Sequence, residues 1–426
     1  MIDVVGWRID DVVDKIRGAK GSRVRLDVLP ADAGMDGQHK LVTIIRDKVK
    51  LEEQAASKSI IDVQGKHIGI ITLPGFYLDF EAARRGDTDA RSATSDVAKL
   101  LGQLKAQHVD GVVMDLRDNG GGSLVEAVEL TGLFIDKGPV VQVRESGGRV
   151  SVENDSKSGV AWDGPLAVLV NRSSASATEI FAAAIQDYGR GLIVGEPTFG
   201  KGTVQNLIDL DRWPTKSGAK FGQVKLTIAQ FFRVDGSTTQ HAGVVPEIQF
   251  PVTVDATEFG ESTFDNALPA SHIAMAPHSN LGNFAPIMPS LISHHATRVA
   301  KDREFSWWSK DVAQFRTERD RKIISLNEND RRIERDREEA KRKQRQAERK
   351  ALGLADANAD DDDGLQANER NVAQQVAAEA AAKKRSDPLL RETAAILADA
   401  ITMLGADAKL AAQVMPVTHR ANVWSD

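Results

Sequence analysis

The sequence predicts an α/β (α+β) core between about residues 60 and 251, followed by a mainly helical C-terminal part. Short apolar runs alternate with helical patterns in the core, and turn residues separate them. Such runs form buried strands when helices cover a sheet. The chain has 426 residues, and a single hydrophobic core seldom grows large enough for such a length. We therefore expect two or three domains.

The first 45 residues predict only part of a domain. Ile9, Val12, Val13 and Ile16 follow helical spacing, and residues 24–29 alternate as a half-buried strand does. One helix and short strand pieces cannot bury an apolar face by themselves. We therefore expect the sequence to begin inside a domain.

The core itself predicts four buried strands and three helices. The strands are expected over residues 68–73, 111–116, 166–170 and 192–195, and the helices over residues 97–104, 124–133 and 179–185. Their alternating order is the one typical of an α/β layer.

Beyond Pro251 the composition becomes loop-rich and then strongly charged. Residues 331–349 predict an exposed helix with pairs of opposite charge four positions apart. Acidic residues interspersed there favour a solvated helix over a nucleic-acid-binding or calmodulin-like one. The aspartates at 360–363 predict a flexible linker, since they lack the ligand spacing of a calcium loop. An alanine-rich helix, interrupted at Pro388, is expected over residues 373–404.

The bulk composition excludes several classes of function. A formal net charge of -6 gives no overall attraction to nucleic acid or anionic lipid. Without cysteine there is no disulfide, thiolate metal site or thiol nucleophile, so covalent chemistry needs Ser, Thr, Lys or a carboxylate. No apolar run reaches the length of about 18 residues that a membrane span needs. The first seven residues lack the features of a secretory signal.

Ser176 closes a turn between a predicted strand and a predicted helix. Small side chains in residues 171–176 allow a tight turn that exposes a hydroxyl, and the helix start offers unpaired N–H groups. This geometry suits a nucleophile whose oxyanion intermediate must be stabilised. Taken alone, the pattern fits a plain N-cap by Ser174 or Ser176 better.

Lys201 favours the catalytic interpretation. It lies between two glycines, with Phe199 and Val204 nearby, in a loop that can exclude water from its amine. Burial disfavours the ammonium form, so that the pKa can fall from about 10.4 toward neutrality. A neutral amine can take the hydroxyl proton of Ser176. In an extended segment Gln205 lies on the same face as Lys201 and could orient it.

Two glycine-rich patterns leave other interpretations open. Gly195 and Gly200 before Lys201 nearly match a phosphate-binding loop, but Gly202 replaces its hydroxyl residue and no clear helix follows. Residues 115–123 enter a triple-glycine turn before a helix, where backbone N–H groups could bind a phosphate or an oxyanion. By itself a triple glycine indicates only a turn.

Together these three blocks resemble the carboxyl-terminal processing, or tail-specific, serine peptidases. Residues 115–122, 174–180 and 195–205 look like that family's motifs, in the family's order. The interval between Ser176 and Lys201 is similar to the family's and selects Ser176 over the neighbouring serines. Gln205 falls where the family places the third residue of a Ser/Lys/Gln triad.

The resemblance implies a serine endopeptidase that acts on unfolded or C-terminally exposed proteins. The N–H groups of Ala177 and of a glycine near Gly122 are implied as its oxyanion hole. No cofactor or metal is implied. The expected partners are protein or peptide substrates with exposed carboxyl termini. An adaptor protein is a further candidate partner, and nucleic acid is not expected to bind.

The resemblance also divides the chain into three domains. Residues 1–45 are similar to the second half of a PDZ domain, residues 46–252 to the peptidase core, and residues 253–426 to the helical extension of larger Gram-negative members. A periplasmic location is implied by the family alone. Because the front of the PDZ domain is not in the sequence, the alternative function is a catalytically impaired binding or scaffolding protein.

Other acids and histidines are poorer catalytic candidates. Asp187 ends the helix that Ser176 begins, roughly 16 Å away along an ideal helix, which favours a structural role. His294 and His295 lie in the proline-containing stretch, and the sequence has no H-E-x-x-H motif. A metalloprotease is therefore disfavoured.

Overall fold

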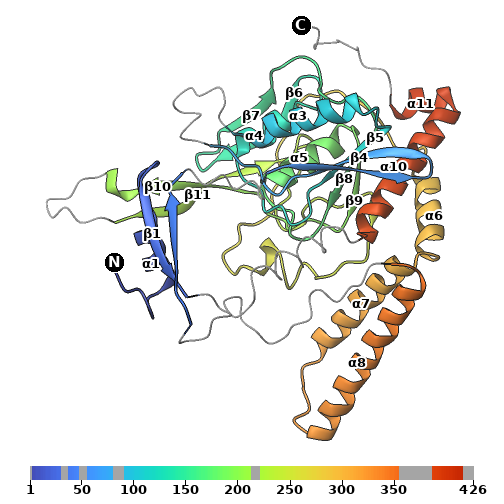
Figure 1. The fold of residues 1–426 in the computed structure, drawn as a ribbon. Helices are drawn as coiled ribbons and strands as arrows, with labels where there is room; N and C mark the ends of the chain where they lie inside the picture. The colour runs from blue at the N-terminus through green and yellow to red at the C-terminus, as the bar shows by residue number, and fades with distance from the viewer. Residues whose placement is uncertain are drawn as a thin grey trace. The chain divides into compact units, whose positions relative to one another are not determined.

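The computed structural model describes residues 2–29, 37–47, 55–79, 91–212, 221–354 and 386–415. The chain divides into two compact units. One comprises residues 1–52 and 323–386, and the other comprises residues 53–322 and 387–426. The larger unit contains the predicted core (Figure 1).

A six-stranded sheet in the order β12-β9-β8-β5-β4-β3 forms the centre of the larger unit. Its strands are β3 (Ser57–Val63), β4 (Lys66–Thr72), β5 (Gly111–Asp115), β8 (Leu166–Val170), β9 (Leu192–Gly195) and β12 (Ile248–Gln249). β3 is antiparallel to β4, and the other neighbours are parallel. The four predicted strands are confirmed as β4, β5, β8 and β9.

Helices cover both faces of this sheet. One core cluster joins it to α3 (Ala93–Ala106), α4 (Leu124–Thr131) and α5 (Ala177–Asp187), which confirm the three predicted helices. A second cluster joins the other face to α6 (Met288–Val299) and α10 (Pro388–Ala406). On β5, Val112 and Met114 belong to the first cluster and Val113 to the second, because side chains alternate along a strand. Burial on both faces explains why these strands are continuous apolar runs.

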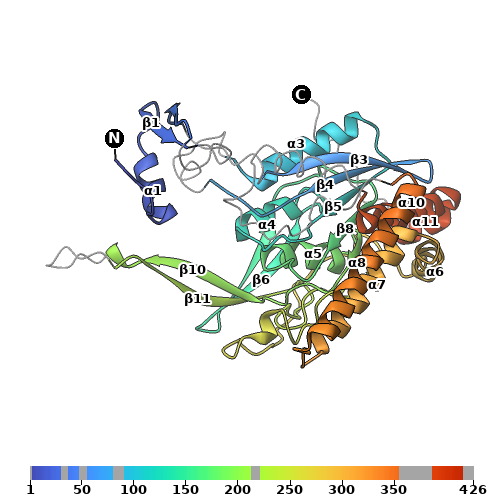
Figure 2. The same ribbon diagram turned by 60° about the horizontal axis from the view of Figure 1, so that its bottom comes forward.

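A second, antiparallel sheet has the order β10-β11-β6-β7 and was not predicted. It consists of β6 (Gly138–Glu145), β7 (Val150–Asp155), β10 (Thr203–Asp209) and β11 (Gln223–Phe232). The first six residues of β11 are exposed, so polar and apolar residues mix along it. β10 and β11 form a long arm in Figure 2.

The remaining elements of the larger unit are short, apart from one helix. They are η3 (Leu210–Arg212), η4 (Glu261–Thr263), α7 (Arg303–Asp320) and α11 (Ala408–Val414). The predicted interruption at Pro388 is the start of α10. Proline suits the first turn of a helix, and the preceding Asp387 accepts hydrogen bonds from the N–H groups of Leu389 and Leu390.

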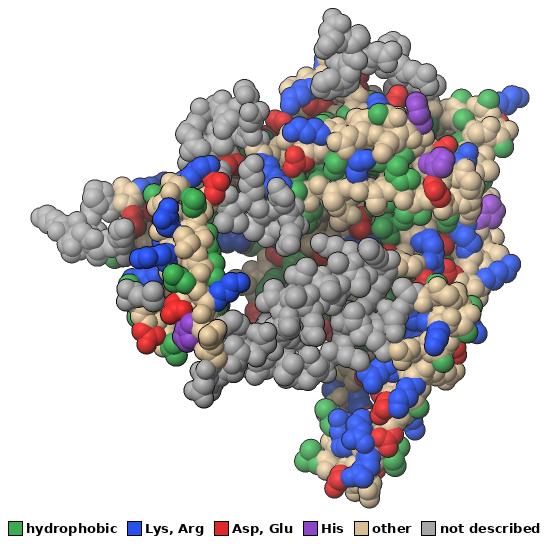
Figure 3. Space-filling view, in the orientation of Figure 1, with side chains coloured by type: hydrophobic (Ala, Val, Ile, Leu, Met, Phe, Trp, Pro, Cys, Tyr) green, Lys and Arg blue, Asp and Glu red, His purple; other side chains and the backbone are tan. Residues whose placement is uncertain are grey.

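The smaller unit contains α1 (Ile9–Ile16) and the antiparallel strands β1 (Arg23–Val28) and β2 (Lys40–Ile45). The predicted first helix and first strand are thereby confirmed. The same unit contains α8 (Glu328–Ala351), none of whose residues is buried. Acidic and basic side chains mix along α8 at the bottom of Figure 3. This helix is the solvated one that the charge pattern predicts.

Two expectations concern residues outside the described ranges, namely the acidic linker at 360–363 and the helix over residues 373–385. Of the helices that the structure describes, none combines the length and apolar character needed to cross a membrane.

Candidate active site

Ser176 is the N-cap of α5 and has an unusual backbone conformation. Its φ is 59° and its ψ is -114°, a region that residues other than glycine seldom occupy. Backbone strain of this kind concentrates at functional sites. The neighbouring Ser174 is fully buried, donates to the Leu116 carbonyl (2.8 Å) and accepts from the Asn171 N–H (3.0 Å). Ser174 therefore shapes the turn, and Ser176 stands at the helix start.

The glycine loop after β5 lies directly against this turn. Gly121 has φ 102°, and a Cβ placed on it would lie 2.7 Å from the Ala175 oxygen and 2.9 Å from the Ala177 nitrogen. Only glycine permits both this φ and this approach. The Asn119 carbonyl accepts from the Ala175 N–H (3.0 Å) and from the Thr178 hydroxyl (2.9 Å). The loop and the start of α5 are thus held together.

The two predicted oxyanion donors lie on opposite sides of this junction. Ala177 is the first residue of α5, so its N–H has no acceptor within the helix. Gly122 is exposed, and its neighbours Gly121 and Ser123 make the backbone bonds to Phe76. Those bonds leave the N–H of Gly122 out of the pairing with Phe76.

Lys201 lies two residues before the start of β10 at Thr203, and β10 contains Gln205. The Lys201 Nζ donates to the Gln205 Oε1 over 3.0 Å, so the contact expected between these side chains is present. Burial lowers the pKa of the Lys201 amine, and the positive charge of Lys225 lowers it further, while Glu261 and Glu179 act in the opposite direction. A strand instead of a helix after Lys201 also contradicts the phosphate-loop alternative.

Glu179 connects the serine segment to the lysine segment. Its Oε2 accepts from the backbone N–H groups of Ser176 (2.8 Å) and Lys201 (3.0 Å). Its Oε1 accepts from the Thr198 hydroxyl (2.6 Å) and the Gly200 N–H (2.8 Å). Because two N–H groups share one oxygen, the backbones of Ser176 and Lys201 lie next to each other.

The environment of Glu179 is unusual for a carboxylate. The side chain is fully buried, and burial raises its pKa to about 7 against the opposing effect of its four hydrogen bonds. The sequence motifs point to Ser176 and Lys201 but not to this role of Glu179. An acid three residues after an N-cap serine is a capping-box signal, and it could have predicted the bond to Ser176 but not the bond to Lys201.

The other candidates lie in structural contacts. The side chain of Asp187 is only 5% exposed and forms an ion pair with Arg233, whose Nε lies 3.2 Å from Asp187 Oδ1, as a structural role would require. His295 Nδ1 lies 2.9 Å from Glu392, and His294 Nδ1 lies 3.6 Å from Asp399. Both histidines belong to α6, which packs on the sheet face opposite α5.

Comparison with known proteins identifies the class to which this site belongs. Residues 67–250 match the model of peptidase family S41, and residues 254–402 match that of the C-terminal domain of tail specific protease. Residues 67–250 of the chain belong to peptidase family S41.

Individual relatives agree with this class. Over 347 residues the chain is 44% identical to the tail-specific protease of Haemophilus influenzae, covering 79% of this chain and 47% of the relative. It is 31% identical over 247 residues to the chloroplastic carboxyl-terminal-processing peptidase 2 of Arabidopsis thaliana, which covers 57% of this chain and 43% of the relative. The chain thus spans about half the length of these curated relatives. The solved structure of a photosystem II D1 C-terminal processing protease is 28% identical, with a TM-score of 0.38. The match covers 56% of this chain and 58% of that protein.

Proposed function

We propose that the chain is a serine endopeptidase in which Ser176 is the nucleophile, Lys201 the general base and Gln205 the residue that orients Lys201. One observation carries the proposal: the N–H groups of Ser176 and Lys201 bond to the same oxygen of Glu179. Membership of a peptidase family supports the same assignment.

The proposed reaction forms and then hydrolyses an acyl-enzyme. Ser176 Oγ attacks the peptide carbonyl carbon while its proton passes to the neutral Lys201 amine. The N–H groups of Ala177 and Gly122 stabilise the oxyanion. When the tetrahedral intermediate collapses, Lys201 returns the proton to the leaving amine. Lys201 then accepts a proton from the water that attacks the ester and returns it to Ser176.

Two features support this chemistry electrostatically. Burial lowers the pKa of Lys201, which increases the neutral fraction that can act as a base. The hydrogen bond to Gln205 fixes the amine without adding a charge that would raise its pKa. Gln205 is therefore suited to orient a neutral lysine.

The proposed substrates are unfolded proteins and proteins with exposed carboxyl termini. Support comes from the tail-specific protease of Haemophilus influenzae and from the match of residues 254–402. The division into a partial PDZ domain at 1–45, a core at 46–252 and a helical domain at 253–426 belongs to this proposal. So do an adaptor partner and a periplasmic location.

An assay with a disordered protein tests the function. The chain should cleave it, Ser176→Ala should not, and a fluorophosphonate probe should label Ser176. A chain that binds peptides without turnover and without labelling would overturn the proposal and favour the scaffolding alternative.

A further inference from the structure

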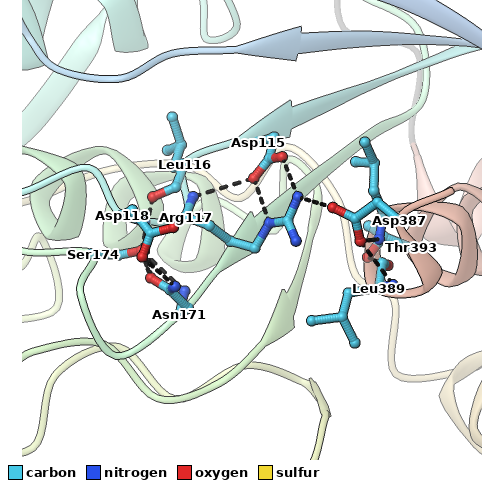
Figure 4. Close-up of polar contacts among 10 residues, drawn as sticks. Asp115, Leu116, Arg117, Asp118, Asn171, Ser174, Asp387, Leu389 and Thr393 are labelled. Atoms are coloured by element: carbon cyan, nitrogen blue, oxygen red, sulfur yellow. Dashed lines mark hydrogen bonds and ion pairs between the residues drawn. The ribbon is translucent and has the colours of Figure 1, made fainter. Parts of the chain in front are cut away.

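An ion cluster joins the glycine loop to a residue far away in the sequence. Arg117 Nη2 lies 2.6 Å from Asp115 Oδ2 and 2.6 Å from Asp387 Oδ2 (Figure 4). Arg117 Nε also donates to Asp115 Oδ1 over 2.9 Å. Asp115 is the last residue of β5, and Asp387 precedes α10. The guanidinium thus bridges the core sheet and the C-terminal helix.

Asp387 uses its two carboxylate oxygens for different purposes. Oδ1 accepts from the N–H groups of Leu389 and Leu390, each over 3.0 Å, and so caps α10. Oδ2 is the oxygen that binds Arg117. Residues 392–400 of α10 are buried, and the helix packs on the core sheet. Asp387 is consequently held at a defined position relative to β5.

The segment after Arg117 connects this cluster to the candidate active site. Asp118 has φ 59°, and its N–H donates to Asn171 Oδ1 over 3.0 Å. The next residue, Asn119, binds the serine turn through its carbonyl and the Gly121 N–H (2.9 Å) through its side chain. A displacement of Arg117 would therefore be transmitted to the glycine loop through only a few residues.

Both carboxylate partners stabilise the positive charge of Arg117. Its side chain is only 19% exposed, and burial opposes its charge. The two aspartates outweigh this effect and raise the pKa of the guanidinium above its ordinary value. Without Asp387 the guanidinium would pair with Asp115 alone and lose the contact that ties it to α10, which favours rearrangement of the Arg117 side chain.

We propose that Asp387 is a positioning residue of the active site. Through Arg117 it holds residues 115–122 so that the Gly122 N–H meets the oxyanion, and the C-terminal helical part thereby influences the rate of acyl transfer. The inference rests on the proposed peptidase function. It assigns a role in the reaction to a residue outside the segment that matches the peptidase family model.

Serine at position 387 would separate this role from helix capping. Asp387→Ser keeps an N-cap oxygen but is too short to reach Arg117. Asp407→Ser is the matched control, because Asp407 caps α11 through bonds to the N–H groups of Lys409 (2.8 Å) and Leu410 (3.1 Å). In the described part of the chain, no guanidinium is recorded beside Asp407.

Steady-state cleavage of one disordered peptide and thermal unfolding of each full chain test the proposal. We expect Asp387→Ser to lower kcat about 10-fold, less than the loss of a whole oxyanion donor causes, with KM changed less than about twofold. Its Tm should match that of Asp407→Ser. Asp387→Asn, which can still accept from Arg117, should recover part of kcat.

Other results would overturn the proposal. If the wild type is active, equal kcat values for Asp387→Ser and Asp407→Ser would refute the positioning role alone. A change in Asp387→Ser that is confined to KM or Tm would refute it as well. Absence of turnover and of Ser176 labelling in the wild type would refute the peptidase function, and the positioning role with it.

Discussion

The amine of Lys201 donates a hydrogen bond to the amide oxygen of Gln205, 3.0 Å away on the following strand. An amide acceptor orients the amine without carrying charge. A carboxylate there would stabilise the ammonium form instead, because an opposite charge within about 4–6 Å raises the pKa of a lysine. A neutral partner at this position thus suits the proposed role of Lys201 as the base.

Gln205→Glu should move the pH profile of cleavage. Wild-type kcat/KM should rise with pH through the pKa of Lys201, which burial lowers, because only the neutral amine accepts a proton. In Gln205→Glu the rise should shift upward by about one to two pH units. Asn206→Asp, which places a carboxylate on the opposite face of β10, is the control and should shift the profile less. Identical profiles for Gln205→Glu and wild type would contradict the assignment.

Ser176→Ala and Lys201→Arg should each lower kcat/KM at least about 1,000-fold while the fold is retained. Arginine keeps its proton at all practical pH values and cannot serve as the base. Lys58→Arg is a suitable control, because the Lys58 amine bonds to Gln107 on the surface, outside the candidate active site. Circular dichroism would verify folding, and full activity of Lys201→Arg would refute a lysine base.

Gly121→Ala should abolish cleavage, whereas Gly120→Ala should not. A methyl group on Gly121 would meet the Ala175 oxygen at 2.7 Å and strain a positive φ, but one on Gly120 would meet nothing within 4 Å. We expect a loss of at least about 100-fold for Gly121→Ala, as for removal of an oxyanion donor. Similar kcat values for the two variants would show that the loop tolerates displacement from the serine turn.

Glu179 should make stability depend on pH. Its folded pKa of about 7 exceeds the unfolded value of 4.5, so the folded state binds its proton more tightly. The stabilisation is complete below pH 4.5 and is lost as pH rises through about 7. Shifts of this size correspond to about 3 kcal/mol, an order-of-magnitude figure.

Urea unfolding of wild type, Glu179→Gln and the exposed control Glu129→Gln at pH 5 and pH 8 tests this dependence. Glu179→Gln should lose it and be destabilised by roughly 1–3 kcal/mol at pH 8, since an amide N–H₂ would face backbone N–H donors. The control should keep the wild-type difference. An unfolding free energy that changes between pH 5 and pH 8 by the same amount in wild type and in Glu179→Gln would refute this assignment.

The sequence predicted β4, β5, β8 and β9 of the central sheet because burial on both faces leaves continuous apolar runs, whereas β3 and the two-residue β12 were not predicted. The β10–β11 arm was missed because its exposed residues mix Lys225 and Thr227 with apolar neighbours, and a register shift interrupts the pairing beside Gln205. In the site, residues close in sequence were found through local motifs. The bridge from Arg117 to Asp387 spans 270 positions and has no local signal.

Covering the central sheet from both faces also affects when the protein can fold. One face depends on α10, which buries apolar residues such as Val113 and Leu169. During synthesis that face remains open to water until residues 388–406 have left the ribosome, because N-terminal parts emerge first. Until then, Arg117 at the start of the glycine loop also lacks its contact with Asp387. A nascent chain would therefore complete its proposed active site only after residues 388–406 have been made, well after Ser176 and Lys201, which delays cleavage of neighbouring unfolded chains during synthesis.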